Sequence, residues 1–330
     1  MLSGDRSRIL TQVPPLVSRR DHKDAFAMDY YISWTHSDPI YQQHLPGSRV
    51  LVSPPSVNLS WTVNRWPIAP HSLLVDSGAF QHYRTGRKIM PEQVLRRQVA
   101  LVDNTPVPVG LCHLDVPMMG AHNLDELNLR MHQSLLNARW LIEQAIHYPL
   151  PEHARLIGVI QGYSRESIYN SALALAEMGY TNFALGSLAR MVASSRNELV
   201  SRVEAALEAV GPRIHVLGVS SVAVLPELAR LGIESTDSGA PIHEAWRGGI
   251  FYSRPFRRFK LASPRMREWS RTYSFAEILD APLPCDCPVC REDSTRLMHP
   301  QGKIYINLRA LHNTYHLARE IADLSSAEQT

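Results

Sequence analysis

The sequence predicts a (β/α)8 barrel with a C-terminal zinc-binding subdomain, and three observations support this fold class. From Leu73 onward, short β-like apolar runs alternate with amphipathic helical stretches, which indicates parallel strands joined by helical crossovers. Polar residues follow many of these runs, as expected for a barrel whose single site collects residues from all of its strand ends. Three of the four cysteines lie within six residues, which favours a bound metal over a disulfide framework.

The elements follow in chain order. Residues 1–25 mix charges and prolines, and we expect an N-terminal extension there. Short apolar pieces between Tyr30 and Trp66 indicate strands only weakly. Proline at the first position favours a helix at 91–102, and the capping-box pattern Ser195-Arg-Asn-Glu198 favours one at 195–210. The strand and helix pairs predicted after residue 72 are 73–76 with 91–102, 110–115 with 123–145, 156–161 with 164–178, 182–186 with 195–210, and 215–219 with 222–231, followed by a last strand at 233–237.

An open, doubly wound sheet would fit the same alternation. The loop expected at 76–90, after the first clear strand, has neither the GxGxxG nor the GxxxxGK[ST] pattern of nucleotide-binding sheets. We therefore favour a barrel at 26–280, including a basic segment at 247–271, with a zinc-binding segment and helix at 281–330 packed on it.

The composition excludes some classes of protein. The chain has 330 residues, 45% of them apolar, and a formal charge of +3. No apolar run approaches the roughly 18 residues of a membrane span, and no signal-peptide core is visible near the N-terminus. We expect a soluble, cytoplasmic protein with no membrane partner, in which a polyanion would be bound by a local basic patch.

The first candidate site is the segment Leu74-Val75-Asp76-Ser77-Gly78-Ala79-Phe80-Gln81, in which an apolar strand ends in an acid, small residues, a ring and an amide. Glycine lets a flat ligand approach the backbone, Phe80 can stack on that ligand, and Asp76 and Gln81 can accept and donate hydrogen bonds. An isolated Asp-Ser-Gly is more often a plain turn. The return of the pattern after later strands favours a site.

The segment 247–271 is strongly basic, with the acid Glu268 as its one counter-charge, and it contains interleaved aromatic residues. Such a composition suits phosphate contact and base stacking. The alternative is a solvated surface segment whose aromatic side chains pack on the barrel. The candidate nucleic-acid contacts are Arg247, Arg254, Arg257, Arg258 and Lys260.

A structural zinc site is predicted after the barrel. Cys285, Cys287 and Cys290 are followed by a helical stretch at 307–323 that contains His312 and His316, and three thiolates plus one histidine complete a tetrahedron with no open position. His312 and His316 are rival candidates for the fourth ligand. Cys112, within an apolar run, is expected to be a core residue.

In this order the motifs resemble the tRNA-guanine transglycosylase superfamily. The resemblance covers residues 73–321 approximately, and the order of its motifs makes it specific. The matches, with the family pattern in parentheses, are DSGAFQ at 76–81 (DSGGFQ), LDVP at 114–117 (LDxxP), GVIQG at 158–162 (GIVQGG), FALGSLA at 183–189 ((Y/F)AIGGLA), HVLGV at 215–219 (YLMGVG), GIESTD at 232–237 (GxDxFD), and CxCxxC at 285–290 followed by His312-Asn313.

The resemblance implies an enzyme that replaces guanine by a 7-deazaguanine through a covalent intermediate. Asp237 would be the nucleophile that attacks C1′ of the sugar, and Asp76 the general acid and base. The remaining implied roles concern binding of the base. Asp115 and Gln161 would bind its polar edge, and the backbone of Gly186 and Ser187 would bind its carbonyl. Phe80 and Leu217 would pack against its two faces.

Departures from the family pattern favour one branch. Ala79 and Ser187 replace family glycines, and Ser238-Gly-Ala-Pro-Ile-His-Glu-Ala-Trp246 replaces the cysteine and PTR segment that contacts the anticodon loop in tRNA enzymes. These changes favour the DNA-modifying DpdA branch, which inserts 7-cyano-7-deazaguanine (preQ0) into DNA. A tRNA enzyme is the alternative, and a homodimer or helper proteins are possible partners.

Two further classes fit the sequence less well. A non-catalytic partner subunit would be expected to lose the acids Asp76, Asp115 and Asp237, and all three are present. A metal-dependent barrel hydrolase would need a ligand pair such as HxH on an early strand, which the sequence does not contain.

Overall fold

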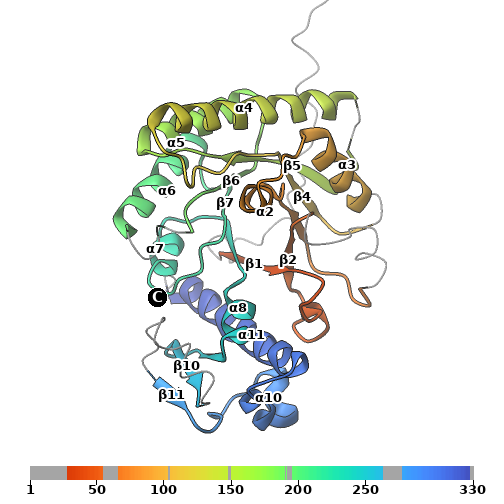
Figure 1. The fold of residues 1–330 in the computed structure, drawn as a ribbon, viewed down its shortest axis with the longest axis vertical. Helices are drawn as coiled ribbons and strands as arrows, with labels where there is room; N and C mark the ends of the chain where they lie inside the picture. Colours follow the sequence, from red (N-terminus) through yellow and green to blue (C-terminus); the bar gives the residue numbers. More distant parts are fainter. Residues whose placement is uncertain are drawn as a thin grey trace, which may run out of the picture.

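A computed structural model describes residues 28–54, 66–102, 105–147, 150–189, 191, 195–262 and 277–327. Eight parallel strands close into a barrel in sequence order, with β1 paired to both β2 and β8, so the predicted (β/α)8 barrel is confirmed (Figure 1). The strands are β1 (Asp29–Trp34), β2 (Arg49–Val52), β3 (Leu73–Val75), β4 (Val109–Cys112), β5 (Ala154–Ile160), β6 (Phe183–Leu185), β7 (Ile214–Val216) and β8 (Ser235–Ser238).

Helices surround this barrel. The described helices between the strands are η1 (Tyr41–Gln43), α2 (Ala79–Thr85), α3 (Pro91–Val102), α4 (Leu124–His147), α5 (Arg165–Glu177), α6 (Arg196–Val210) and α7 (Leu225–Arg230), and α8 (Ala240–Trp246) follows β8. The barrel interior is packed by side chains from six strands: Tyr31, Leu51, Leu74, Cys112, Ile157, Val159 and Ala184. Cys112 is thus the buried core residue that was expected.

Two local predictions are wrong. Residues 79–85 form α2, not a loop, because Gly78 takes the left-handed conformation (φ 73°) that turns the chain directly into a helix. Ser195 precedes α6 but makes no side-chain cap bond, since its φ and ψ of −152° and 57° are not the extended values of a capping residue. The capping box that does form is at α5, between Ser164 and Ser167.

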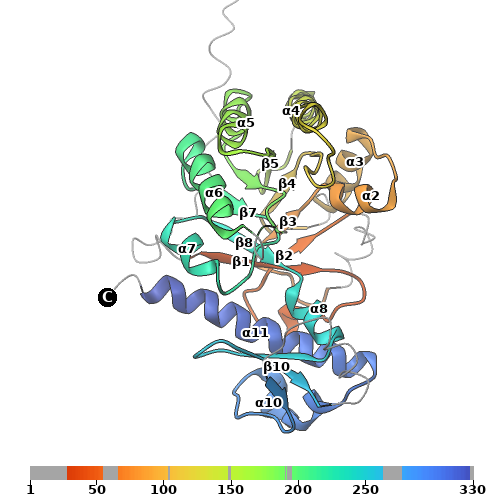
Figure 2. The ribbon, with the colours of Figure 1, turned by 60° about the vertical axis from the view of Figure 1, so that its left-hand side comes forward.

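A second, smaller sheet follows the barrel. It consists of β9 (Gly249–Tyr252), β10 (Arg257–Leu261) and β11 (Glu277–Leu279), with β10 in the centre. After it come α10 (Pro288–Asp293), η2 (Ser294–Met298) and the long α11 (Lys303–Ala327), which contains the predicted helix at 307–323. Helix α11 contacts α8, β9 and β1, so it lies between the small sheet and the barrel (Figures 1 and 2).

Within the described ranges, no helix combines the length and apolar character needed to cross a bilayer.

Candidate active site and metal centre

The carboxyl ends of the barrel strands carry a ring of hydrogen-bonded polar residues. Each of the eight strands contributes one residue, either from its last positions or from the segment that follows it. In strand order these are Ser33, Ser53, Asp76, Asp115, Gln161, Ser187, His215 and Asp237. Active sites of this fold form at this end of the barrel.

Asp76 lies just beyond β3 and is held by two donors. The Ser53 hydroxyl donates to Oδ2 (2.6 Å) and the Gly78 amide to Oδ1 (2.8 Å). Burial, together with the nearby charges of Asp115 and Asp237, raises the pKa of Asp76 to about 7 despite these two bonds. The carboxyl can therefore hold or release a proton near neutral pH, as a general acid and base must.

Asp115, Gln161 and Ser187 form a chain of hydrogen bonds across the ends of β4, β5 and β6. Gln161 Nε2 donates to Asp115 Oδ2 (2.6 Å), and the Ser187 hydroxyl donates to Gln161 Oε1 (2.7 Å) while it accepts from the Met118 amide (3.0 Å). Ser77 donates to the other oxygen of Asp115 (2.8 Å). Burial raises the pKa of Asp115, and the bonds from Ser77 and Gln161 oppose that rise.

Two features of the segment that follows β6 explain the residues found there. A Cβ at Gly186 would overlap the Gln161 amide nitrogen, so glycine is needed for the amide to lie where it does. Ser187 has a φ of 61°, in the left-handed region that favours glycine. The two hydrogen bonds of its hydroxyl offset the strain of a side chain at this position.

Asp237, near the end of β8, is 5% exposed and has three hydrogen-bond partners among the described residues. Ser33 donates to Oδ2 (2.7 Å), and the Gly218 amide donates to Oδ1 (2.7 Å). His215 Nε2 lies 3.2 Å from the same Oδ1. The strand pairing brings these groups together, because β8 lies between β1 and β7.

Asp115 and Asp237 are close enough to Asp76 for their charges to raise its pKa. The charges of all three carboxylates also add to burial in raising the pKa of Cys112, which lies in the barrel core. Several acids gathered at one barrel end are expected to include one that is protonated at neutral pH.

The two residues expected to sandwich a base are accessible. Phe80, in α2, is 45% exposed with the Arg84 guanidinium 5.8 Å from its ring centre. Leu217 is half-buried and packs at the edge of the barrel-core cluster. Neither side chain is fully covered by the protein, so both can contact a ligand.

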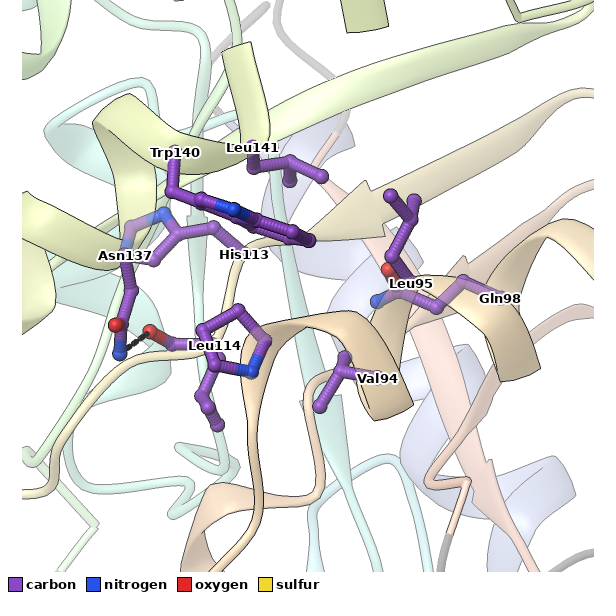
Figure 3. A pocket seen from close by; sticks show the side chains of 9 residues that line it. Val94, Leu95, Gln98, His113, Leu114, Asn137, Trp140 and Leu141 are labelled. Carbon is purple, nitrogen blue, oxygen red and sulfur yellow. Dashed lines mark hydrogen bonds between the residues drawn. The ribbon is translucent and has the colours of Figure 1, made fainter. Parts of the chain in front are cut away.

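A separate small cavity lies between α3, α4 and β4 (Figure 3). Gln98 and His113 line it, and Gln98 Nε2 donates to Cys112 O (2.8 Å), which ties α3 to β4. The cavity volume is about 10 Å³, far below the several hundred Å³ of a ligand site. It lies in the helical layer of the barrel and is too small for a base.

The described part of the basic segment, residues 247–262, forms β9 and β10 of the small sheet with their flanking turns, and its arginines have acidic partners. Arg257 pairs with Glu277, Arg254 with Asp323, and both Arg247 and Arg258 with Glu244. Lys260 is 3% exposed, and the aromatic residues Phe251, Tyr252 and Phe259 are buried. Arg254, Arg257 and Arg258 remain about half exposed and Arg247 is 35% exposed, so a phosphate can reach these four, whereas Lys260 is buried. Residues 263–271 of the segment, including Trp269, lie outside the described residues.

The predicted zinc ligands converge. Donor atoms of Cys285, Cys287, Cys290 and His312 all lie within 4.8 Å of one another. His312 Nδ1 is 3.3, 3.5 and 3.9 Å from the three sulfurs of Cys287, Cys290 and Cys285, close to the ~3.6 Å edge of a tetrahedron with zinc bond lengths. Burial lowers the pKa of His312, which keeps the ring neutral as a metal ligand must be.

The hydrogen-bond geometry also distinguishes the roles of the two histidines. His312 Nε2 donates to Phe251 O (2.8 Å), which leaves Nδ1 free to face the sulfurs. His316 Nδ1 accepts from the Ser253 amide (3.0 Å), so its Nε2 carries the hydrogen that faces Cys285 Sγ at 3.2 Å. His312 therefore fits the ligand position, and His316 acts as a hydrogen-bond donor to one thiolate.

Several site residues were missed from the sequence. Ser33, Ser53 and Ser77 each donate to one of the three carboxylates, and His215 also contacts Asp237. A single serine carries no motif of its own. His215 could have been found, since it opens the HVLGV motif of the predicted strand that precedes the one ending in Asp237.

Comparison with known proteins agrees with this geometry. The model of the family described as "Queuine tRNA-ribosyltransferase" matches residues 64–327. Proteins of that name from Syntrophobacter fumaroxidans and Azotobacter vinelandii are 27% and 28% identical to the chain; the alignments cover 78% of the chain in both cases and 70% and 71% of those proteins. A "DNA-guanine transglycosylase" of Salmonella montevideo is 28% identical over 90 residues, which are 27% of the chain and 21% of that protein.

The family match extends over most of the chain and includes the barrel from β3 onward, the small sheet and the cysteine cluster. The chain belongs to the queuine tRNA-ribosyltransferase family of pentosyltransferases, the guanine transglycosylases.

Proposed function

We propose that the chain exchanges guanine in DNA for a 7-deazaguanine, preQ0, through a covalent aspartyl-sugar intermediate. The observation that carries the proposal is the ring at the barrel end, in which Asp76, Asp115 and Asp237 are each held by donors from neighbouring strands. Carboxylates so arranged can exchange a proton with a base, bind its polar edge and attack its sugar.

In the first half of the reaction, Asp237 attacks C1′ as the bond from C1′ to guanine N9 breaks, and protonated Asp76 supplies a proton to the departing base. In the second half, ionised Asp76 takes a proton from the incoming base, whose N9 attacks C1′ and releases Asp237. A pKa of about 7 for Asp76 suits both halves.

The heterocycle would lie between Phe80 and Leu217. Its polar edge would meet Asp115 and Gln161, and the backbone at Gly186 and Ser187 would bind its carbonyl. The hydrogen bonds from Ser187 to Gln161 and from Gln161 to Asp115 support this role. They fix the orientation of the Gln161 amide, and hence which of its atoms faces a ligand.

Zinc, held by Cys285, Cys287, Cys290 and His312, would stabilise the packing of α11 and take no part in the chemistry. We infer a cytoplasmic location, because none of the four cysteines forms a disulfide and a thiolate zinc site suits a reducing compartment.

DNA is favoured as the substrate because residues 238–246, which include α8, differ from the cysteine and PTR segment to which the family resemblance assigns anticodon-loop contact in tRNA enzymes. The Salmonella montevideo relative acts on DNA by its name. A base in a duplex must leave the stack to reach a barrel-end site, at a cost of a few kcal/mol. The half-exposed Arg254, Arg257 and Arg258 would hold the distorted strand.

A tRNA substrate is the second candidate. The family model and the relatives that align over most of the chain carry the name queuine tRNA-ribosyltransferase.

The deciding experiment offers labelled guanine or labelled preQ0 together with duplex DNA, single-stranded DNA or bulk tRNA, and measures which polymer takes up label. Label in DNA and none in tRNA supports the proposal, and the reverse result selects the tRNA enzyme.

Asp237→Ala should abolish a denaturation-resistant adduct between protein and nucleic acid. Asp280→Ala, which removes an exposed carboxylate beside the small sheet, is the control and should leave the adduct intact.

The contribution of the basic segment is tested by binding. Arg257→Glu with Arg258→Glu should weaken nucleic-acid binding and reduce its dependence on salt. Arg165→Glu, a similarly exposed arginine on α5, should change neither. Equal effects of the two changes would contradict a role for the small sheet.

A further inference from the structure

His215 is the least expected member of the ring. It is 5% exposed and lies in β7, at the position where the resembled family motif has tyrosine. Its Nδ1 lies 2.8 Å from the Ser235 hydroxyl and its Nε2 3.2 Å from Asp237 Oδ1. The ring also meets Tyr31 edge to face, with 5.4 Å between the ring centres. Three contacts therefore fix its orientation.

The direction of these hydrogen bonds follows from their partners. An ionised carboxylate can only accept, so the hydrogen between His215 and Asp237 is on Nε2 whether the ring is neutral or charged. The Gly218 amide donates to the same oxygen, Oδ1, at 2.7 Å. Among the described residues, Oδ2 accepts one bond, from Ser33, at 2.7 Å. The two oxygens of Asp237 are therefore unequal in the part of the chain that the structure describes, since Oδ1 has two donors there and Oδ2 has one.

We propose that His215 is a positioning residue that makes Oδ2 the attacking atom and Oδ1 the oxygen that carries the charge when the carboxylate departs. This rests on the proposed function. In the first half-reaction, a lone pair of Oδ2 forms the bond to C1′, and the electrons of the C1′ to N9 bond leave with guanine, which takes the proton of Asp76. In the second half, the electrons of the C1′ to Oδ2 bond return to the carboxylate as N9 of the incoming base bonds to C1′.

Donors on Oδ1 affect the two halves in opposite ways. They stabilise the anion, which makes the carboxylate a weaker nucleophile but a better leaving group. Without His215, the covalent intermediate should form readily and resolve slowly. A loss of general packing would instead slow both halves.

The test follows the adduct in time. Enzyme and oligonucleotide are mixed without free base, and the adduct is measured after denaturation; excess preQ0 is then added and the decay of the adduct is recorded. His215→Phe keeps an aromatic ring against Tyr31 and removes the donor. We expect its adduct to decay at least about tenfold more slowly than that of the wild type, as for a lost hydrogen bond to a charged group, while formation changes less.

Two companion variants separate positioning from packing. His215→Gln retains an N–H donor and should restore decay to within a few-fold of the wild-type rate. Ser33→Ala removes the donor to Oδ2 and should leave decay faster than in His215→Phe. Two results would overturn the inference while base exchange by the wild type stands. One is an adduct of His215→Phe that decays at the wild-type rate, and the other is a His215→Phe protein in which adduct formation and adduct decay are slowed equally. Absence of both adduct and exchange in the wild type would overturn the proposed function itself.

Discussion

At the scale of single residues, the raised pKa of Asp76 links the site to stability. Between about pH 4 and pH 7 the folded protein keeps a proton on Asp76 that the unfolded chain releases, so the free energy of unfolding falls as pH rises through this range and levels off above it. The loss is at most about 1.4 kcal/mol per pH unit.

Asp76→Asn stays neutral and should not show this loss. Urea denaturation of both proteins from about pH 4 to about pH 8 is expected to show the variant gaining stability relative to the wild type up to about pH 7. Parallel curves would mean that Asp76 is ionised throughout, and would remove the basis for its acid role.

Gly186 offers a second test at this scale. Gly186→Ala places a methyl group against the Gln161 amide, which must then leave Asp115 and Ser187. We expect the KM for the free base to rise at least about tenfold with little change in Tm, measured by base exchange and thermal unfolding. In a Gln161→Ala background the same change should cost little more, because the contact is already gone; additive losses would contradict the contact.

The sequence was sufficient to predict the acids and the amide of this site, because each ends an apolar run in a recognisable motif. It was insufficient for the hydroxyl donors. Ser33 belongs to β1, whose sequence DYYISW has no regular alternation of apolar and polar residues, and Ser53 reaches Asp76 across a strand pair that was predicted only weakly. Their roles depend on barrel closure, which no local pattern encodes.

At the scale of elements, the helix termini show what a motif can and cannot specify. Ser164 and Ser195 both precede an amphipathic helix, yet only Ser164 has the extended backbone that points its hydroxyl at the first turn. The pattern Ser-x-x-Glu at Ser195 is therefore present without the side-chain hydrogen bonds of a capping box. The short α2 was not predicted for a related reason. The left-handed conformation of Gly78, from which the helix starts, is set by the turn that follows β3.

These two serines form a matched pair. Ser164→Ala should lower the free energy of unfolding by about 1 kcal/mol, the usual value of an N-cap, while Ser195→Ala should change it by less than about 0.5 kcal/mol. Urea denaturation of both variants measures the difference. An equal loss in the two would mean that Ser195 caps α6 in solution.

At the scale of the whole molecule, α11 connects the cysteine cluster to the segment that follows β8. Asn313 donates to Pro241 O and Gly249 O and accepts from the Phe251 amide, and His312 beside it faces the cysteines. Helix α8 starts three residues after Asp237. The cysteine cluster was predictable because its spacing is local, whereas the attachment of α11 to α8 depends on a bond between Asn313 and Pro241, which lie 72 residues apart in the sequence.

Metal removal should therefore affect the whole fold. We expect about one zinc per chain, and Cys287→Ser should lose it and lower Tm by at least about 5 °C. Cys112→Ser, at the other fully buried cysteine, should keep its zinc. Metal analysis and thermal unfolding of both variants decide, and a Cys287→Ser protein with full zinc content would exclude the proposed ligand set.

Because every barrel strand supplies one member of the ring, no single loop determines what the site accepts. A new preference can arise by exchanging one side chain while the other seven positions stay in place, as Ser187 replaces a family glycine and His215 a family tyrosine. Such a design lends itself to stepwise diversification: related chains can differ in the base or polymer they favour while sharing one architecture, and libraries varied at these eight positions would sample that range directly.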